Sequence, residues 1–284
     1  KRQLMISLLY CGNDKVFRGL LISLLSVASH TREALDVHLL TMDLTDRNPA
    51  FRPITEEQSI FLEKILHEKH PESRIARYDI RELFLSEMKD SPNLDSVYTP
   101  YTLLRLFSDL LPLPERVLYL DTDPAAIGDV RPLFEYDMKD CEYAGALDYL
   151  GKVFINPRYI NAGVLLLDLE KIRQTGFFKK ARGLVAEKKL PFPDQDAVNR
   201  LAKKKCFLPR GYNEQRRMRK DTVIRHFSKS IRWLPFYHTV NVKPWEIDRL
   251  HTIYHTYEFD DVLAEYQTKM QDWELSQSCS ENPR

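Results

Sequence analysis

The residues best suited to do chemistry are Asp121 and Asp123, two carboxylates separated by Thr122 at the end of the apolar run 117–120. Runs of Val, Leu and Tyr are typical of buried strands, and α/β proteins bind ligands outside the carboxyl ends of their strands. Two acids this close repel each other unless a cation offsets their charge. The pattern therefore predicts a divalent-metal site. In the alternative interpretation, one aspartate caps a helix that begins at Pro124.

The elements that must position these acids are predicted from hydrophobic periodicity and turn residues. Strands are expected at 4–10, 37–42, 75–78, 116–120, 143–147, 161–167 and 222–227. Helices are expected at 17–28, after the capping box 55–58, at 99–111, at 168–189 and from 194 onward. Strand and helix alternate up to the acidic pair, as in nucleotide-binding α/β domains. From about Asp272 the chain is polar without periodicity, which predicts a disordered tail.

Composition limits the class of protein. The chain has 284 residues, a formal net charge of +1 and 43% hydrophobic residues, which fits one large or two small domains with a real core. A nearly neutral chain gives no support for a nucleic-acid partner. The longest apolar stretch, 19–29, is shorter than the ~20 residues of a membrane span. Four scattered cysteines without a CxxC pair predict free thiols in a reducing compartment.

Further polar residues recur near predicted element ends, and each has two interpretations when taken alone. Asn161-Ala162-Gly163 either enters a strand tightly or forms a small-residue floor beneath a ligand. Asp194-Gln195-Asp196 is also explained as a helix N-terminus with acids that the helix dipole favours. His226 ends an apolar strand and would be an ordinary core histidine, and Lys243-Pro244-Trp245 would be a structural turn.

The joint occurrence of these motifs in one order changes their interpretation. In order, the set is Tyr10-Cys11-Gly12-Asn13-Asp14, Arg105, Asp121-Thr122-Asp123, Asp148, Asn161-Ala162-Gly163, Asp194-Gln195-Asp196, Leu208-Pro209-x-x-Tyr212-Asn213, Ile224-x-His226-Phe227 and Lys243-Pro244-Trp245. From about residue 4 to about residue 250, this set resembles glycosyltransferase family 8. That family contains retaining enzymes such as bacterial lipopolysaccharide glucosyl- and galactosyltransferases and glycogenin.

The resemblance implies an α/β GT-A fold, with a Rossmann-like, mixed, mostly parallel sheet flanked by helices. It also implies a catalytic domain over 1–250, with a nucleotide-sugar half at about 1–125 and an acceptor half at about 126–250. Residues 251–284 would then form a small C-terminal helical extension and a disordered tail.

The resemblance also implies a metal site for Mn²⁺ or Mg²⁺. Asp121 and Asp123 would hold the ion together with a late histidine, and an oxygen and imidazole set suits Mn²⁺. His226 matches the strand and phenylalanine context of the family ligand. His238 stands nearer the family spacing to Lys243, though one residue short, and remains the alternative. Lys243 would contact the phosphates as a compact charge.

The remaining implied roles concern the UDP-sugar donor. The nucleotide-sugar contacts would be Tyr10, Cys11, Gly12, Asn13, Asp14, Arg105, Thr122, Asn161, Ala162, Gly163 and Lys243. The catalytic residues would be Gln195, Asp194 and Asp148. Val16 stands where relatives have an aromatic residue that stacks on uracil. Retention has two possible routes, through a side chain such as Gln195 or Asp194, or through the leaving phosphate taking the acceptor proton.

The implied function is metal-dependent transfer of glucose or galactose from a UDP-sugar to a glycan, lipid-linked or glycoprotein acceptor in bacterial cell-surface polysaccharide synthesis. The expected location is cytoplasmic, peripheral to the inner face of the membrane. Two alternatives remain, a catalytically inert sugar-nucleotide-binding module and a haloacid-dehalogenase-like phosphatase. The phosphatase would require the acidic pair on its first strand.

The segment 203–232 resembles the family least and contains eleven Lys and Arg residues. One interpretation is a solvated basic face. The other is contact with an anionic acceptor or an anionic membrane through 203–237, with Trp233, Phe236 and Tyr237 as interfacial aromatics.

Overall fold

A seven-stranded sheet runs through the centre of the computed structural model, which describes residues 5–96, 98–232 and 238–281, without the side chains of 232 and 279–281. The strand order is β3-β2-β1-β4-β7-β6-β8. The strands are β1 (Ile6–Cys11), β2 (Leu35–Thr41), β3 (Arg74–Asp79), β4 (Arg116–Leu120), β6 (Tyr143–Leu147), β7 (Ile160–Asp168) and β8 (Lys205–Phe207). Only β7 is antiparallel to its neighbours. The predicted mixed, mostly parallel sheet is confirmed.

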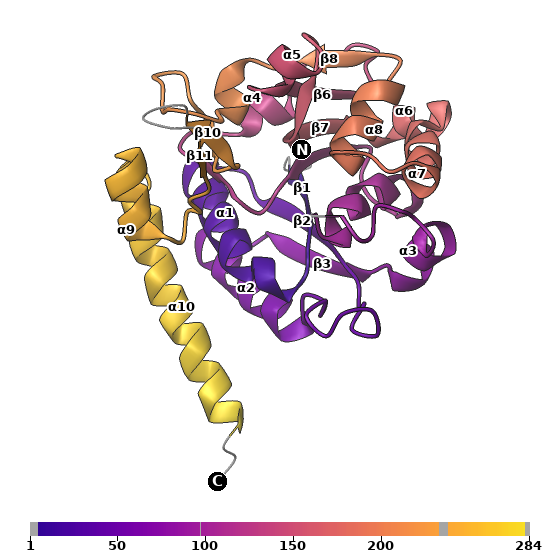
Figure 1. Ribbon diagram of the computed structural model, residues 1–284. Helices are drawn as coiled ribbons and strands as arrows, with labels where there is room; N and C mark the ends of the chain where they lie inside the picture. Colours follow the sequence, from indigo (N-terminus) through magenta and orange to yellow (C-terminus); the bar gives the residue numbers. More distant parts are fainter. Residues whose placement is uncertain (1–4, 97, 233–237, 282–284) are drawn as a thin grey trace.

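Two layers of helices cover the sheet, one on each face (Figure 1). The first contains α1 (Phe17–His30) and α2 (Glu56–Lys69), and the second contains α3 (Arg81–Met88), the 3-10 helix η2 (Pro100–Leu110), α6 (Leu169–Thr175), α7 (Phe177–Glu187) and α8 (Pro193–Leu201). Alternate residues of β1 face opposite layers. Leu8 packs with the first layer and Leu9 with the second. This burial on both faces explains the continuous apolar strand sequences.

Local sequence signals explain several helix ends. Thr55 and Gln58 form the predicted capping box at the start of α2, with reciprocal bonds between side chains and backbone N–H groups. The single helix predicted over 168–189 is wrong, because Gly176 adopts φ +63° and separates α6 from α7. The segment predicted as a helix at 99–111 is the 3-10 helix η2.

A small two-stranded sheet is separate from the main sheet. It pairs β5 (Pro124–Ala126) with β9 (Ile224–His226), and Pro124 lies opposite His226. The alternative in which an aspartate caps a helix at Pro124 is therefore wrong. The chain continues as a strand there.

The other elements are short. They are η1 (Asp14–Val16), α4 (Arg131–Phe134), α5 (Gly151–Phe154), η3 (Arg210–Asn213), β10 (Ser230–Arg232), β11 (His238–Val240), α9 (Ile247–Arg249) and η4 (Leu250–Tyr254).

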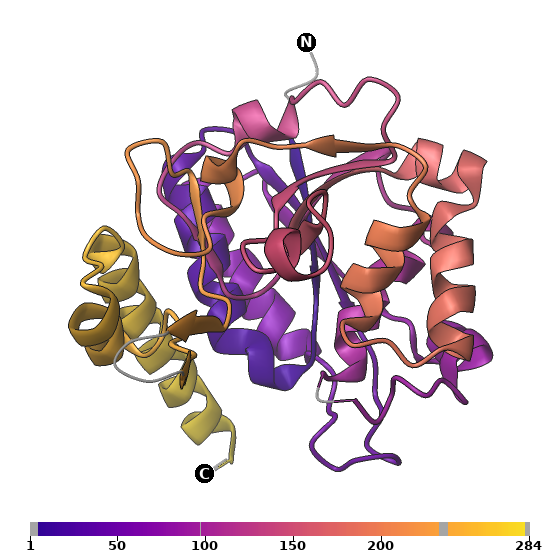
Figure 2. The ribbon, with the colours of Figure 1, turned by 45° about the horizontal axis from the view of Figure 1, so that its top comes forward.

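The C-terminal segment is a long helix, α10 (Asp260–Glu281), and it lies outside α1 in both views of the ribbon (Figures 1 and 2). The disorder predicted from about Asp272 is therefore wrong up to Glu281. Trp273 packs against Phe17 and Phe61, with ring centroids 5.0 Å apart in each pair. This aromatic anchor is a tertiary contact that helical periodicity does not reveal. Within the described part of the chain, no helix is both long enough and apolar enough to cross a membrane.

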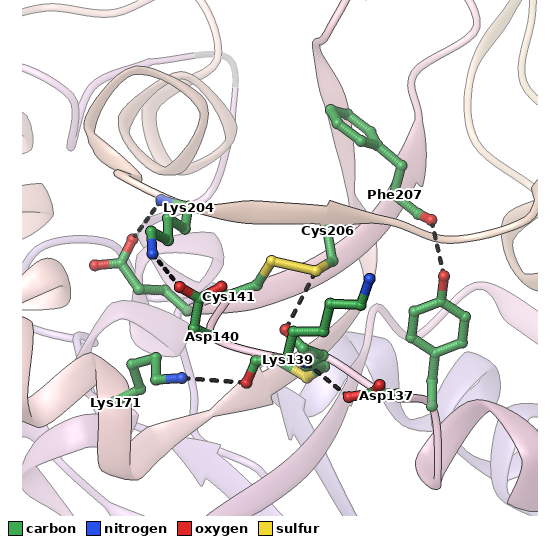
Figure 3. The surroundings of a disulfide bond; sticks show 11 residues. Asp137, Lys139, Asp140, Cys141, Lys171, Lys204, Cys206 and Phe207 are labelled. Carbon is green, nitrogen blue, oxygen red and sulfur yellow. Dashed lines mark hydrogen bonds and ion pairs between the residues drawn. A yellow bond between two sulfur atoms is a disulfide. The ribbon is translucent and has the colours of Figure 1, made fainter.

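A disulfide joins Cys141, two residues before β6, to Cys206 in the edge strand β8 (Figure 3). The prediction that all cysteines are free thiols is therefore wrong. The two residues are 65 positions apart in sequence, but β6 and β8 are adjacent, and the Cα atoms lie 5.8 Å apart. Cys11 is a free, buried thiol. The argument for a reducing compartment loses its basis.

We expect Cys206→Ser to lower the free energy of unfolding by at most about 4 kcal/mol, the loop-closure entropy for the 65-residue separation. The measurement is thermal unfolding with and without dithiothreitol. Reductant should lower the melting temperature of the wild type and leave that of the variant unchanged. A wild-type melting temperature that is insensitive to reductant would contradict a stabilising role for this bond.

Candidate functional site

A cavity of about 630 Å³ opens where β4 and β6 end and β7 begins. Because β7 is antiparallel to β4, its first residues meet the acids that follow β4, and the Asp121 backbone N–H donates to the Gly163 carbonyl at 2.8 Å. The cavity lining includes the predicted residues Arg105, Asp121, Asp123, Asp148, Asn161, Ala162, Gly163, Asp194, Gln195, His226 and Lys243. Segments from distant parts of the sequence thus meet at one site.

Asp121, Asp123 and His226 converge at the floor of this cavity, with one ligand atom of each within 4.8 Å of the others. His226 Nε2 lies 3.2 Å from Asp123 Oδ1 and 3.9 Å from Asp121 Oδ2. Lys243 Nζ contacts the other Asp123 oxygen at 2.5 Å. The set of two carboxylates and one imidazole is suitable for a divalent cation such as Mn²⁺. His238 lies in β11 and is not among the residues that line the cavity.

Asp121 is oriented by two donors that both contact its Oδ1 atom. The Tyr119 hydroxyl donates at 2.6 Å and Arg105 Nη2 donates at 2.8 Å. Arg105 also lies 4.0 Å above the Tyr119 ring and is 3% exposed. Oδ2, the atom that faces His226, is therefore left available for a ligand.

A hydrogen-bond network fixes the tautomer of His226. The Gly163 backbone N–H donates to Asn161 Oδ1 at 3.0 Å, and a backbone N–H cannot act as an acceptor. Asn161 Nδ2 then donates to Asp148, and Asn213 Nδ2 donates to Asn161 Oδ1 at 2.9 Å. The Asn213 carbonyl oxygen must face His226 Nδ1, at 3.1 Å, so Nδ1 carries the hydrogen.

This assignment leaves His226 Nε2 facing two carboxylates. A lone pair beside two anions is unfavourable unless a cation or a second proton lies between them. Metal-binding histidines commonly donate their other ring N–H to an oxygen acceptor. The residues present therefore fit a divalent cation.

The charged groups are strongly perturbed by their surroundings. Burial opposes the charged form of Asp123, but Lys243, together with His226 whenever its imidazole is doubly protonated, outweighs burial and holds the pKa of Asp123 well below its ordinary value. Burial raises the pKa of Asp194, and Arg105 offsets only part of the increase. Burial also disfavours the Arg105 charge, yet Tyr119 and the nearby acids keep its pKa raised.

The cavity wall beside Asp148 is also interconnected. Gln195 Oε1 accepts a bond from the Ala162 backbone N–H at 2.8 Å, and Gln195 Nε2 lies 3.5 Å from Asp148 Oδ2. Asp194 Oδ2 lies 3.2 Å from Arg105 Nε. The N-terminus of α8 thus presents an acid and an amide to the cavity.

Two glycines allow this close packing. A Cβ atom on Gly163 would lie 2.1 Å from His226 Cε1, so only glycine leaves room for the imidazole. A Cβ atom on Gly19, in α1, would lie 2.2 Å from the Thr122 carbonyl oxygen. Helix α1 therefore packs directly against the backbone between the two aspartates.

The segment predicted to contact the nucleotide-sugar, 10–14, does not line the cavity, and neither does Thr122. The Tyr10 hydroxyl bonds Ser23 at 3.0 Å in the core, and Cys11 is buried. The Gly12 carbonyl accepts a bond from Thr41.

The last two residues of this segment also have partners within the protein. Asn13 Nδ2 donates to the Ala50 carbonyl at 3.4 Å, and Asp14 pairs with Arg52 at 3.0 Å. The roles of these five residues and of Thr122 stay predictions.

Several contributing residues were not predicted from the sequence. Tyr119 precedes Asp121 by two residues, a spacing that puts both side chains on the same face of a strand. The sequence could therefore have predicted the contact between them. Asn213 lies inside a motif quoted for the resemblance, but its position behind His226 depends on tertiary structure. Gly19 had no signal, and neither did Tyr149 and Gln215, which also line the cavity.

Most of the basic residues in 203–232 have partners. Ion pairs join Lys204 to Asp140, Arg210 to Glu214 at 2.7 Å, and Arg219 to Asp221 at 2.9 Å; the first pair also lies beside the disulfide (Figure 3). Arg225 is 3% exposed and donates to backbone carbonyls. Trp233, Phe236 and Tyr237 lie outside the described residues. The structure gives no support for membrane contact through this segment.

Comparison with known proteins gives consistent results. The model of Glycosyl transferase family 8 matches residues 7–248. A lipopolysaccharide 1,2-glucosyltransferase from Escherichia coli (strain K12) is 32% identical over 149 residues, which span 46% of this chain and 44% of that protein. The chain thus matches less than half the length of this curated relative.

Solved structures share the fold. The galactosyltransferase LgtC, in complex with donor and acceptor sugar analogs, has a TM-score of 0.68 at 18% identity, covering 93% of this chain and all of that one. The glycosyltransferase GlyE of Streptococcus pneumoniae TIGR4 has a TM-score of 0.65 at 19% identity, covering 97% of this chain and 65% of that one. The predicted GT-A fold is confirmed.

We expect Asn213→Ala to weaken Mn²⁺ binding about 10- to 100-fold, because the imidazole loses the acceptor that fixes its tautomer. The measurement is calorimetric titration of Mn²⁺ in the presence of UDP. The matched control is Asn156→Ala, since Asn156 is exposed and bonds only its local backbone at Arg158. Equal affinity in the two variants would contradict the tautomer assignment.

We expect Gly163→Ala to displace the imidazole of His226, weaken Mn²⁺ binding and destabilise the protein by about 1–3 kcal/mol, as overpacking does. Gly183→Ala is the matched control, because nothing lies within 4 Å of a Cβ atom at that position in α7. Thermal unfolding and Mn²⁺ titration would measure both effects. Unchanged metal binding in Gly163→Ala would show that His226 is not a ligand.

Proposed function

Because the chain belongs to glycosyltransferase family 8, we propose that it transfers glucose or galactose from a UDP-sugar to an acceptor hydroxyl, with retention and with a divalent metal. The observation that carries this proposal is the convergence of Asp121, Asp123 and His226, with a lone pair directed at the two carboxylates. Such a group is unfavourable unless a cation or a second proton lies between the imidazole and the carboxylates, and a bound divalent cation would meet that requirement.

Asp121, Asp123 and His226 would hold Mn²⁺ or Mg²⁺. A cation bound there would supply electrostatic stabilisation of the leaving diphosphate. Lys243, which pairs with Asp123 in this structure, would contact the same phosphates as a compact charge. Both groups would act on charge that develops as the bond to the sugar breaks.

Asp148, Asp194 and Gln195 are proposed as the catalytic residues that face the donor sugar. They lie on one wall of the cavity and are held by Asn161, Arg105 and Ala162, respectively. Fixed oxygen atoms on this wall would stabilise positive charge that develops on the sugar ring.

The backbone at Gly12 and Asn13, with Tyr10, Cys11, Asp14 and Thr122, is proposed to complete the nucleotide site. The side chains of Tyr10 and Cys11 are buried, so their contribution would come through the backbone.

The acceptor is proposed to be a glycan of bacterial cell-surface polysaccharide, since the curated relative is named a lipopolysaccharide glucosyltransferase. Lipid-linked and glycoprotein acceptors belong to the same proposal. The cytoplasmic location stays a prediction.

The decisive experiment is an array of UDP-sugars assayed for UDP release with Mn²⁺ or with EDTA. We expect one UDP-hexose to give metal-dependent release, and Asp123→Asn to reduce it about 10²- to 10³-fold, the usual cost of removing an electrostatic stabiliser. Asp129→Asn is the matched control, because Asp129 is exposed and bonds only the local backbone of Arg131.

Three results would contradict the proposal. UDP release that persists in EDTA would show that the reaction does not depend on a metal. Full activity of Asp123→Asn would show that Asp123 is not an essential metal ligand. Binding of UDP without turnover of any UDP-sugar would favour the inert sugar-nucleotide-binding module.

A further inference from the structure

The cations that line the cavity are of two kinds. Arg105 is paired with Asp121 and Asp194, and Lys243 is paired with Asp123. Arg216 and Lys229 also line the cavity, but neither has a carboxylate partner among the described residues. Two positive charges therefore face the cavity without compensation.

Arg216 is held in place although it is exposed. Its guanidinium lies 4.3 Å from the centre of the Tyr149 ring, and Nη1 donates to the Tyr149 hydroxyl at 2.7 Å. Its backbone N–H donates to Glu214 at 2.8 Å. A guanidinium has five N–H donors, so most remain available to a ligand. Stacking fixes its position before any ligand arrives, which lowers the entropy cost of binding.

The neighbouring residue strengthens this arrangement. Gln215 Oε1 accepts a bond from the Tyr149 backbone N–H at 2.9 Å, and its Nε2 donates to the Leu147 carbonyl at 3.1 Å. The segment that contains Arg216 is thus bonded to the loop that follows β6. That loop begins with Asp148, which belongs to the proposed donor-sugar wall.

Lys229 follows the metal-site histidine by three residues and is exposed. It makes no hydrogen bond or ion pair with any described residue. Of the other basic residues of 203–232, three pair with acids and two are bonded to polar groups, namely Lys204, Arg210, Arg219, Lys205 and Arg225. Lys203, Arg217 and Lys220 do not line the cavity. Among the described basic residues of this segment, Lys229 and Arg216 line the cavity without an acidic partner.

The donor's own charge already has partners in the proposed function, namely the metal site and Lys243. Arg216 lies instead beside Tyr149, on the side of the cavity where Asp148 would face the sugar. The ligand for the two remaining cations therefore belongs to the second substrate.

We propose, on the basis of the proposed function, that Arg216 and Lys229 bind an anionic group, a phosphate monoester or a carboxylate, on the acceptor sugar. A planar guanidinium fork together with a compact ammonium group suits either anion. The acceptor is thus an acidic glycan rather than a neutral one.

The test measures binding of matched sugars by calorimetry or ligand-observed NMR, with UDP and Mn²⁺ at saturating concentration. The probes are glucose, glucose 6-phosphate and glucuronate, and the corresponding galactose series. We expect an anionic form to bind at least about tenfold more tightly than the neutral sugar, as charge-assisted hydrogen bonds give. The phosphate and uronate arms identify which anion is recognised.

Arg216→Gln and Lys229→Gln should each reduce this preference, and the double variant should abolish it. Arg217→Gln is the matched control, because Arg217 is exposed, adjacent in sequence and absent from the cavity lining. Affinity for UDP with Mn²⁺ should stay unchanged in all variants.

Equal binding of neutral and anionic sugars, no binding of either anion, or a preference that survives in the double variant would each overturn the inference. A parallel loss of UDP affinity in Arg216→Gln and Lys229→Gln would assign the cations to the donor and overturn it while leaving the proposed function intact. Absence of metal-dependent UDP binding in the wild type would instead refute the proposed function.

Discussion

The site depends on holding two carboxylates next to one imidazole, although the like charges of Asp121 and Asp123 favour separation. Two antiparallel pairings impose this arrangement. The Asp121 N–H is bonded to Gly163 of β7, and His226 of β9 lies opposite Pro124 of β5. Backbone pairing sets the positions of the three groups. The hydrogen bonds of the strands therefore hold the two carboxylates together against their repulsion, and a bound cation would reduce that repulsion.

The same constraint reaches the wall of the cavity through hydrogen bonds. His226 is bonded to Asn213, Asn213 to Asn161, and Asn161 to Asp148. A buried polar network in which every member has a partner is rigid, because each lost bond leaves an unsatisfied group behind. The candidate metal ligand His226 and the proposed donor-sugar residue Asp148 are therefore held by the same hydrogen-bond network. A change in the position of the imidazole should therefore shift Asp148, because only the side chains of Asn213 and Asn161 lie between them in the network.

The sequence contained much of this arrangement because several signals are local. The end of β4 at the acids, the capping box at Thr55 and the helix that begins before Asp194 each follow from residue types within a few positions. Other features required three-dimensional neighbours. The Cys141–Cys206 bond depends on β6 and β8 being adjacent, and the stability of α10 depends on Trp273 meeting two rings from other helices.

The charge of the segment 203–232 is a further property that the local sequence alone does not predict. A count of eleven basic residues in 203–232 suggests a strongly positive surface. In the fold, however, the acids that neutralise Lys204, Arg210 and Arg219 come both from within the segment and from outside it. A cation bonded to an acid contributes little to the attraction of a distant anion, because the pair is nearly neutral as seen by the ligand. Recognition of an anion is therefore predicted by the number of cations that face a cavity without an acidic partner. This number cannot be counted from the sequence, because the partner of each basic residue depends on the tertiary structure.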